Sequence, residues 1–363
     1  MSADTTTHVL VVDDSAVVRQ TITALLQYRP DITTSIAADP FIAMEKMKKR
    51  RPDVILLDLE MPRMDGLTFL KKVMAEDPTP VIVCSGHVGD GSEQAMLALE
   101  NGAVELIAKP KIGVQAFLHE AAVTIVDAIR AAAVYRLPGD RRCGTGSQPV
   151  QRPRRAAALS GGGRVENPSH MPRQPSLIAI GASTGGPEAL REILPALSSQ
   201  TPGIVIVQHM PEFFTGSFAR HLDQLCAIEV REAKSGDEVL SGRALIAPGN
   251  HHMSVHEFGG RFFVDIVDGP LVSRHRPSVD VLLHSVARCA GGNSIGVILT
   301  GMGNDGAEGL REMKNAGAYT IAQDEASCAV FGMPREAIRG GAACEVGHTS
   351  RIAEIIRHCA RVA

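Results

Sequence analysis

The middle of the chain holds a stretch that cannot contribute to a folded core, and this divides the sequence in two. Residues 138–176 read PGDRRCGTGSQPVQRPRRAAALSGGGRVENPSHMPRQPS, with seven arginines against two acids and few large apolar side chains. Such a segment buries too little surface to offset the entropy lost on ordering. We therefore expect a flexible linker at 131–175 between two domains, at 7–130 and 176–363. Its arginines either solvate the tether or contact an acidic partner.

Both flanking segments repeat one pattern, in which an apolar run is followed by a turn and a helix-like segment. In the first half the apolar runs are HVLVVDD at 8–14, DVILLDL at 53–59, PVIVCSG at 80–86 and AVELIAKP at 103–110. In the second half they are SLIAIGAS at 176–183, GIVIVQHM at 203–210, ALIAPG at 244–249, SIGVILTG at 294–301 and AYTIAQD at 318–324. Such runs are typical of parallel strands covered on both faces. We expect two doubly wound α/β domains, the first flavodoxin-like, with sites beyond the C-terminal strand ends.

One stretch breaks this pattern. Residues 251–269 read HHMSVHEFGGRFFVDIVDG, with two strand-like runs on either side of Gly259 and Gly260. Paired glycines between such runs predict a β-hairpin. We therefore expect the second sheet to be mixed, although mainly parallel.

Composition and charge exclude several classes of protein. The formal net charge of −3 offers no general electrostatic footprint for nucleic acid. No apolar stretch reaches the roughly 18 residues that a membrane span requires, and the first residues do not resemble a secretory signal. The seven cysteines are scattered and form no CxxC pair, which favours a reducing compartment over disulfides or zinc. We expect a cytoplasmic protein without a nucleic-acid partner and without membrane insertion.

Polar side chains follow the strands of the first half at the same predicted sheet edge. Asp13 and Asp14 follow one strand and Asp58 another, while Ser85 and Lys109 end two more. Three converging carboxylates repel one another unless a hard cation such as Mg²⁺ lies among them. With a hydroxyl and a lysine beside them, they form a site for moving a phosphoryl group onto a carboxylate. The alternative for the first two acids is helix N-capping.

The motifs VVDDS, LLDLEMPRMDGL, CSG and AKP stand in this order, and with them the first half resembles the response-regulator receiver family from about Thr7 to Arg130. The resemblance implies that Asp58 accepts a phosphoryl group from a histidine kinase. It also implies that Asp13, Asp14 and Asp58 hold Mg²⁺ together with the backbone carbonyl of Glu60.

The same resemblance implies that Ser85 and Lys109 bind the phosphoryl oxygens. One position departs from the family pattern. Three residues before Lys109, where the family usually has an aromatic switch residue, this chain has Leu106.

The glycine-rich turn GASTGG at 181–186 does not fit a phosphate-binding loop. Pro187 and Glu188 follow where a P-loop needs lysine and then serine or threonine, and Ser183 stands where a dinucleotide fingerprint needs its second glycine. A second stretch, GMGNDG at 301–306, does match GxGxxG and has Asp324 at the distance of a ribose-binding acid. Against dinucleotide binding there, Asp305 would bring negative charge into the pyrophosphate cradle.

A nucleophilic serine explains the first turn better. Ser183 ends a strand and precedes a predicted helix, His209 directly follows the next strand, and Asp305 follows a third. Serine, histidine and aspartate at one sheet edge can form a nucleophile, a base and an orienting acid. Backbone N–H groups near Met302 and Gly303 could form an oxyanion hole. Alternatively, Ser183 and Asp305 only cap helices and His209 is a satisfied polar residue. Four other histidines are weaker candidates for the base: His251, His252, His275 and His284.

The second half resembles the CheB-type methylesterase family over nearly all of 176–363. The resemblance is carried by IGASTGGPEAL, VIVQHMP, LIAPGNHHM, RPSVDVLLHSVA, ILTGMGNDGAEGL and AQDEASCAVFGMP. It implies that Ser183 is the nucleophile, His209 the general base and acid, and Asp305 its orienting carboxylate. It further implies that Thr184 lies beside the nucleophile and that Met302 contributes a backbone donor to the oxyanion hole.

Together the two resemblances imply an esterase activated by phosphorylation and needing no cofactor for its own chemistry. They also imply that its substrates are glutamate methyl esters, and glutamines, on the cytoplasmic helices of chemoreceptors. The receiver would shield the catalytic cleft until it is phosphorylated. Two other functions stay open: a regulator whose second half only binds a partner, and an oxidoreductase that uses GMGNDG.

Overall fold

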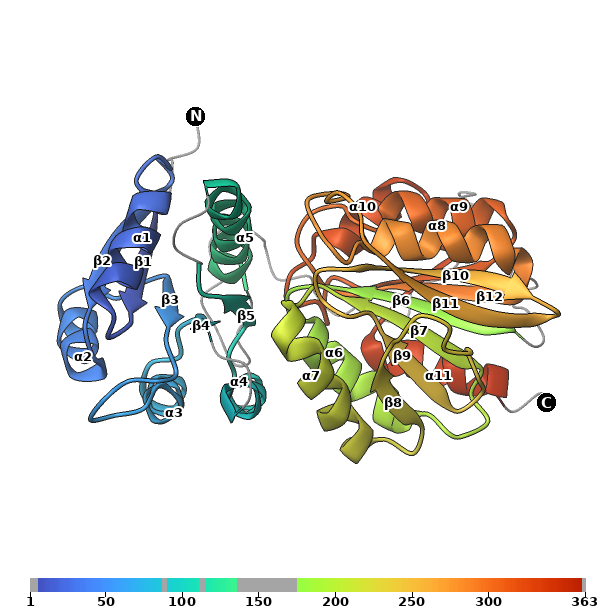
Figure 1. Ribbon diagram of the computed structural model, residues 1–363, viewed down its shortest axis with the longest axis horizontal. Coiled ribbons are helices and arrows are strands. Elements are labelled where there is room, and N and C mark those ends of the chain that lie inside the picture. Colours follow the sequence, from blue (N-terminus) through green and yellow to red (C-terminus); the bar gives the residue numbers. More distant parts are fainter. Residues whose placement is uncertain (1–5, 87–89, 111–114, 136–174, 361–363) are drawn as a thin grey trace, which may run out of the picture.

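The computed structural model describes residues 6–86, 90–110, 115–135 and 175–360, so the predicted linker lies largely outside the described residues. Two α/β halves lie side by side, coloured blue to teal and lime to red (Figure 1). No helix in the described part of the chain is both long enough and apolar enough to cross a membrane.

The N-terminal half is built on a parallel sheet with the order β2-β1-β3-β4-β5. Its strands are β1 (Thr7–Val12), β2 (Ile32–Ala37), β3 (Val54–Leu57), β4 (Val81–Ser85) and β5 (Glu105–Ala108). Its helices are α1 (Ala16–Leu26), α2 (Pro40–Lys49), α3 (Gly66–Glu76), α4 (Asp90–Glu100) and α5 (Gln115–Ala133). This arrangement confirms the predicted flavodoxin-like, doubly wound fold. Only β2 escaped prediction, because this edge strand is buried at its two ends alone.

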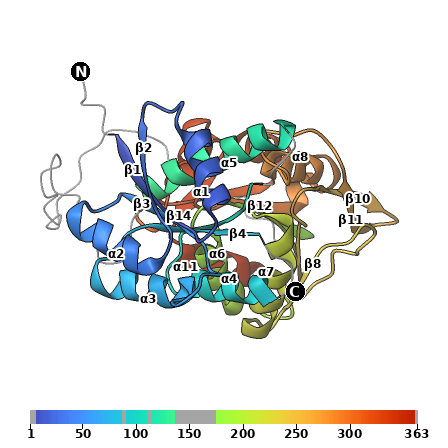
Figure 2. The same ribbon diagram turned by 60° about the vertical axis from the view of Figure 1, so that its left-hand side comes forward.

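Local sequence begins several of these helices. The Asp39 carboxylate accepts a hydrogen bond from the N–H of Ile42, and Pro40 occupies the first turn of α2. Asp65 caps α3 in the same way. Side-chain oxygens at these positions satisfy N–H groups that the helix itself cannot. Helices α1 and α5 pack on one face of the sheet, and α2, α3 and α4 cover the other (Figure 2).

The C-terminal half has a seven-stranded sheet with the order β14-β13-β12-β6-β7-β9-β8, in which every neighbouring pair is parallel. Its strands are β6 (Leu177–Ala182), β7 (Gly203–Gln208), β8 (Glu229–Glu232), β9 (Arg243–Ile246), β12 (Ser294–Ile298), β13 (Tyr319–Gln323) and β14 (Glu345–Gly347). Its helices are α6 (Gly186–Ile193), α7 (Glu212–Leu225), α8 (Val279–Cys289), α9 (Ala307–Asn315), α10 (Met333–Arg339) and α11 (Thr349–Ala360). Two short 3₁₀ helices complete it, η1 (Leu194–Ala196) and η2 (Gly291–Asn293).

The predicted hairpin exists, but the prediction that it makes the second sheet mixed was wrong. Strands β10 (His252–Phe258) and β11 (Arg261–Val267) pair antiparallel and form a separate two-stranded sheet. The hairpin instead packs through β10 against α8, where the N–H of Val255 donates to the Ser285 hydroxyl at 2.9 Å. The sequence of a hairpin does not specify whether its edges pair with another sheet or stay free while one of its faces packs on a helix.

The order of the strands creates a topological switch point in this half. Strand β6 is the first strand of the half, yet it lies between β7 and β12, so the chain builds the sheet on one side of β6 first and on the other side later. Helices α6, α7 and α11 cover one face and α8, α9 and α10 the other (Figure 1). In open α/β sheets, such a switch point is where ligands bind.

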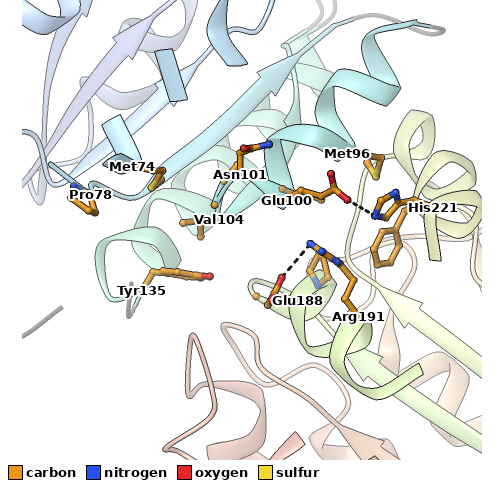
Figure 3. Close-up of a pocket in the computed structure, with 16 residues that line it drawn as sticks. Met74, Pro78, Met96, Glu100, Asn101, Val104, Tyr135, Glu188, Arg191 and His221 are labelled. Atoms are coloured by element: carbon orange, nitrogen blue, oxygen red, sulfur yellow. Dashed lines mark hydrogen bonds and ion pairs between the residues drawn. The ribbon is translucent and has the colours of Figure 1, made fainter. Parts of the chain in front are cut away.

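The two halves are in contact through α4, β5 and α5 of the first. Helix α4 packs against α7, and an oxygen of Glu100 lies 2.9 Å from His221 Nε2. On α5, Asp127 pairs with Arg274 at 3.1 Å. A cavity of about 430 Å³ lies between the halves, with Met96, Tyr135 and Arg191 among its lining residues (Figure 3).

Candidate active site

The structure brings the three acids of the N-terminal half together. Asp13 and Asp58 are buried, Asp14 is exposed, and one oxygen of each lies within 4.8 Å of the others. Lys109 Nζ lies 3.0 Å from Asp13 and 2.7 Å from Asp58. Burial raises the pKa of Asp58, as does Asp13, against the lowering effect of Lys109. An all-oxygen cluster of this kind fits a hard divalent cation.

The capping alternative does not describe these acids. The N-cap of α1 is Ser15, whose hydroxyl accepts from the N–H of Val18, and Asp13 accepts from the N–H of Ser15 at 2.8 Å. Ser85 ends β4 and is buried, beside the acids at the sheet edge. Leu106, at the position of the missing aromatic residue, is buried in β5.

Around Ser183 the chain makes a tight turn that only glycine permits. Gly185 has a φ of +78°, and a Cβ added there would lie 2.5 Å from that of Ala329. Across the turn, a Cβ on Gly301 would lie 2.6 Å from that of Ser183. Gly301, which directly precedes Met302, is therefore packed against the serine. Ser183 itself is only 5% exposed.

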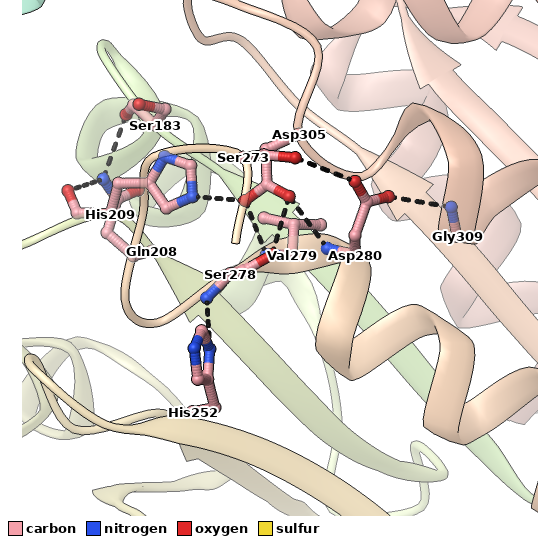
Figure 4. A network of polar contacts seen from close by, with 10 residues as sticks. All are labelled: Ser183, Gln208, His209, His252, Ser273, Ser278, Val279, Asp280, Asp305 and Gly309. Carbon is pink, nitrogen blue, oxygen red and sulfur yellow. Dashed lines mark hydrogen bonds and ion pairs between the residues drawn. The ribbon is translucent and has the colours of Figure 1, made fainter. Parts of the chain in front are cut away.

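His209 and Asp305 form a buried pair beside this turn. His209 Nε2 lies 2.9 Å from Asp305 Oδ2. An ionised carboxylate only accepts hydrogen bonds, so Nε2 carries the imidazole proton and Nδ1 carries the lone pair. Nδ1 is buried and has no hydrogen-bond partner among the described residues. Ser183 and Asp305 lie on different sides of the ring (Figure 4).

Asp305 is held by the start of α8, which sequence reasoning missed. Its carboxylate accepts hydrogen bonds from the N–H groups of Val279 and Asp280 at 2.7 and 3.0 Å, and from the Ser278 hydroxyl at 2.8 Å. Burial would raise the pKa of Asp305, but the bond from His209, its charge and the helix N–H groups lower it to about 2. The motif RPSVD does carry a helix-start signal, a serine before an apolar run, but no signal for its distant partner.

The base has a further neighbour in His275. Its ring stacks on that of His209, with centroids 3.7 Å apart and planes 10° apart. Burial and the nearby His209 lower the pKa of His275 to about 3, so His275 is neutral near pH 7. The uncharged ring of His275 therefore packs flat against His209, and His275 is not an alternative candidate for the base. The loop that carries His275 also carries Arg274, which pairs with the receiver half.

Thr184 faces the other half of the molecule. Its hydroxyl donates to an oxygen of Glu105, on β5, at 2.7 Å. This contact joins the residue after the serine to the receiver-like sheet and was not predicted from sequence.

The dinucleotide alternative finds no support at GMGNDG. The carboxylate of Asp305 in this motif accepts hydrogen bonds from His209 and from the start of α8. Asp324, the expected ribose ligand, accepts from the N–H and hydroxyl of Ser327 at 2.9 and 2.6 Å.

Comparisons with known proteins agree with this division of the chain. A family model described as CheB methylesterase matches residues 178–356, and one described as response regulator receiver domain matches residues 9–120. The chain is 53% identical to protein-glutamate methylesterase/protein-glutamine glutaminase 5 of Anaeromyxobacter dehalogenans, over 97% of this chain and 96% of that protein. It is 54% identical to protein-glutamate methylesterase/protein-glutamine glutaminase 3 of Geobacter metallireducens, over 97% and 98%. Among solved structures, the Thermotoga maritima CheB methylesterase catalytic domain is 39% identical, covering 50% of this chain and 98% of that one, with a TM-score of 0.49.

Proposed function

The chain belongs to the CheB family of protein-glutamate methylesterases/protein-glutamine glutaminases that carry a receiver domain, and from that premise we propose that Ser183, His209 and Asp305 perform the hydrolysis. The observation that carries this assignment is the buried 2.9 Å contact between His209 Nε2 and Asp305 beside the serine turn. The substrates are glutamate methyl esters and glutamines on the cytoplasmic helices of chemoreceptors, so the protein acts in the cytoplasm.

In the first half of the reaction, the Ser183 hydroxyl attacks the ester carbon of the substrate. His209 Nδ1 accepts the serine proton, because Nε2 is already occupied by its bond to Asp305. The resulting imidazolium is stabilised by a carboxylate that α8 keeps ionised. His209 then returns the proton to the leaving oxygen, and methanol departs. With a glutamine the leaving group is ammonia.

In the second half, water attacks the acyl-serine with His209 again as base, which restores Ser183 and releases a glutamate. Both steps pass through a negatively charged oxygen. The N–H of Met302 and the hydroxyl of Thr184, on the two sides of the serine turn, are the donors proposed for it. Ser183 has no hydrogen bond to His209 in this state, and such bonds often tighten only when substrate binds.

Control comes from the N-terminal half, where Asp58 is the proposed phosphoryl acceptor from a histidine kinase. Asp13, Asp14 and Asp58, with the carbonyl of Glu60, would hold Mg²⁺. Bound there, Mg²⁺ would neutralise part of the charge of the phosphoryl group. Lys109 and Ser85 would bind its oxygens.

The closed arrangement supports inhibition by the unphosphorylated receiver domain. Glu105, Glu100 and Asp127 each contact the catalytic half across the interface. A phosphoryl group at Asp58 recruits Lys109 and Ser85, which terminate β5 and β4. Such a change at one end of these strands can weaken docking through the same strands and their helices.

The test is methanol release from methylated receptor membranes, with wild type and Ser183→Ala, each with and without a small phosphodonor and Mg²⁺. We expect release to require Ser183 and to rise with the phosphodonor. An Asp58→Asn variant should keep the basal rate and lose the stimulation. Absence of release from a demonstrably methylated cognate receptor would contradict the esterase assignment and favour a binding role for the second half.

A further inference from the structure

A single receiver carboxylate reaches the serine turn in the described part of the chain. Glu105 begins β5, an edge strand of the receiver sheet, and its side chain is partly buried against the catalytic half. Its Oε2 accepts the Thr184 hydroxyl at 2.7 Å, and Thr184 directly follows Ser183 and is 3% exposed. Glu105 is therefore a receiver side chain inserted beside the proposed nucleophile.

The electrostatics agree with this position. Burial raises the pKa of Glu105 to about 7, while the Thr184 hydroxyl and His209 oppose that rise. The carboxyl is thus buried in contact with a proposed oxyanion donor, one residue from Ser183.

Two other polar contacts between the described residues of the two halves are different in kind. The pair between Asp127 and Arg274 is peripheral, with the arginine side chain 59% exposed. The contact between Glu100 and His221 joins two helices, α4 and α7. Neither contact touches the serine turn. Docking of the domains therefore does not by itself explain why a glutamate is placed at Thr184.

The chemistry of the reaction suggests the reason. The substrate is the side chain of a glutamate, blocked as an ester or amide, and the product is the free γ-carboxyl group. Glu105 offers the same two methylenes and the same terminal carboxyl. We propose that Glu105 is an internal mimic of the product, which occupies the site of the substrate's glutamyl group and bonds to Thr184 in its place.

This inference rests on the proposed function and adds the means of inhibition to it. A shared site makes Glu105 and the receptor's side chain competitors, so removal of Glu105 should lower KM without changing kcat. The length of the side chain also matters. Aspartate is one methylene shorter and loses the bond to Thr184, whereas glutamine keeps both the length and an acceptor oxygen.

The experiment measures unstimulated methanol release by full-length Glu105→Ala, Glu105→Asp and Glu105→Gln, together with inhibition by a fully demethylated receptor fragment. Loss of one buried hydrogen bond predicts a rise in kcat/KM of about fivefold to tenfold for the alanine and aspartate variants. Inhibition by the fragment should strengthen by the same factor. The glutamine variant should stay within about twofold of wild type, because its acceptor remains.

The matched control is Asp127→Ala, which also removes an interdomain contact. The arginine of this pair is 59% exposed, which screens the contact, so this variant should change kcat/KM by about twofold or less. An equal gain in Asp127→Ala and Glu105→Ala would overturn the inference and make Glu105 an ordinary docking contact, as would no gain in Glu105→Ala or Glu105→Asp. Phosphodonor-stimulated wild type and Ser183→Ala run alongside. If their release does not differ, the proposed function itself has failed.

Discussion

At the scale of single residues, the site depends on keeping one buried carboxylate charged. Asp305 is 1% exposed, and burial of that degree normally favours the neutral acid. Its oxygens instead receive two backbone N–H groups, a hydroxyl and an imidazole N–H. The N-terminus of α8 adds a favourable dipole. The start of this helix therefore sets the tautomer of His209.

Asp305→Asn tests this dependence. An amide can present its NH₂ to His209 Nε2, which would place the imidazole proton on Nδ1, the nitrogen proposed to accept from Ser183. We expect kcat to fall by about 10³- to 10⁴-fold, while the fold is retained. Steady-state kinetics with phosphodonor, together with circular dichroism, would check this. Loss of less than about tenfold would contradict the proposed role.

The same residues mark what the sequence can predict. Ser183, His209 and Asp305 stand at strand ends, so a doubly wound sheet brings them to one edge, as observed. His275 and Glu105 reach the site from a loop and from another domain. No local pattern specifies these partners, because each contact depends on how distant elements pack.

At the scale of elements, the turn after β6 is packed so closely that it leaves no space for a side chain at Gly185. Gly185 has both a positive φ and a neighbour where a Cβ would lie, Ala329 at 2.5 Å. Gly236 has a similar φ of +86° but no atom within 4 Å of the added Cβ. Alanine at Gly236 would meet backbone strain alone, whereas alanine at Gly185 would meet both backbone strain and a steric clash.

We therefore expect different costs for alanine at these positions. Gly185→Ala should lower the free energy of unfolding of the catalytic half by about 2–4 kcal/mol, since left-handed strain and overpacking add. Gly236→Ala should cost about 1 kcal/mol from strain alone. Urea denaturation of the full chain, followed through the transition of the catalytic half, gives both values. Equal costs would indicate that the neighbours of Gly185 relax freely.

Buried central strands were predicted from their apolar runs, as was the edge strand β5, but the three other edge strands of the two parallel sheets were not. Strands β2, β8 and β14 are short or largely polar, because half of an edge strand's surroundings is solvent. The hairpin was recognised from its paired glycines. Its packing on α8 was not predicted, because the sequence of an amphipathic face does not indicate which element will cover it.

At the scale of the whole molecule, the receiver domain presents α4, β5 and α5 to the catalytic domain (Figure 1). The apolar core of the α6 and α7 face is continuous with that of the receiver's α2, α3 and α4 face. Docking thus combines burial of apolar surface with a few polar contacts. The strength of these polar contacts can change with the charge of the groups that make them.

Docking should therefore depend on pH through Glu105. In the docked state its pKa is raised to about 7 from an ordinary 4.5. The docked state therefore binds the Glu105 proton more tightly than the undocked state does. Protonation of Glu105 stabilises docking in full below pH ~4.5, and this stabilisation is lost as pH rises from ~4.5 to ~7. Above pH ~7, Glu105 causes no further change in the docking equilibrium. Unphosphorylated wild type should accordingly open as pH rises from 5.5 to 7.5, with a larger radius of gyration in small-angle X-ray scattering.

Other ionisable side chains, Glu100 and His221 among them, also lie at the interface, so the comparison with Glu105→Gln carries the test. Glutamine cannot titrate but keeps the hydrogen-bond acceptor for Thr184. Its pH response should therefore be shallower than that of wild type. If the two responses coincide, the pH dependence of docking does not come from Glu105, which then keeps the same charge in the docked and undocked states.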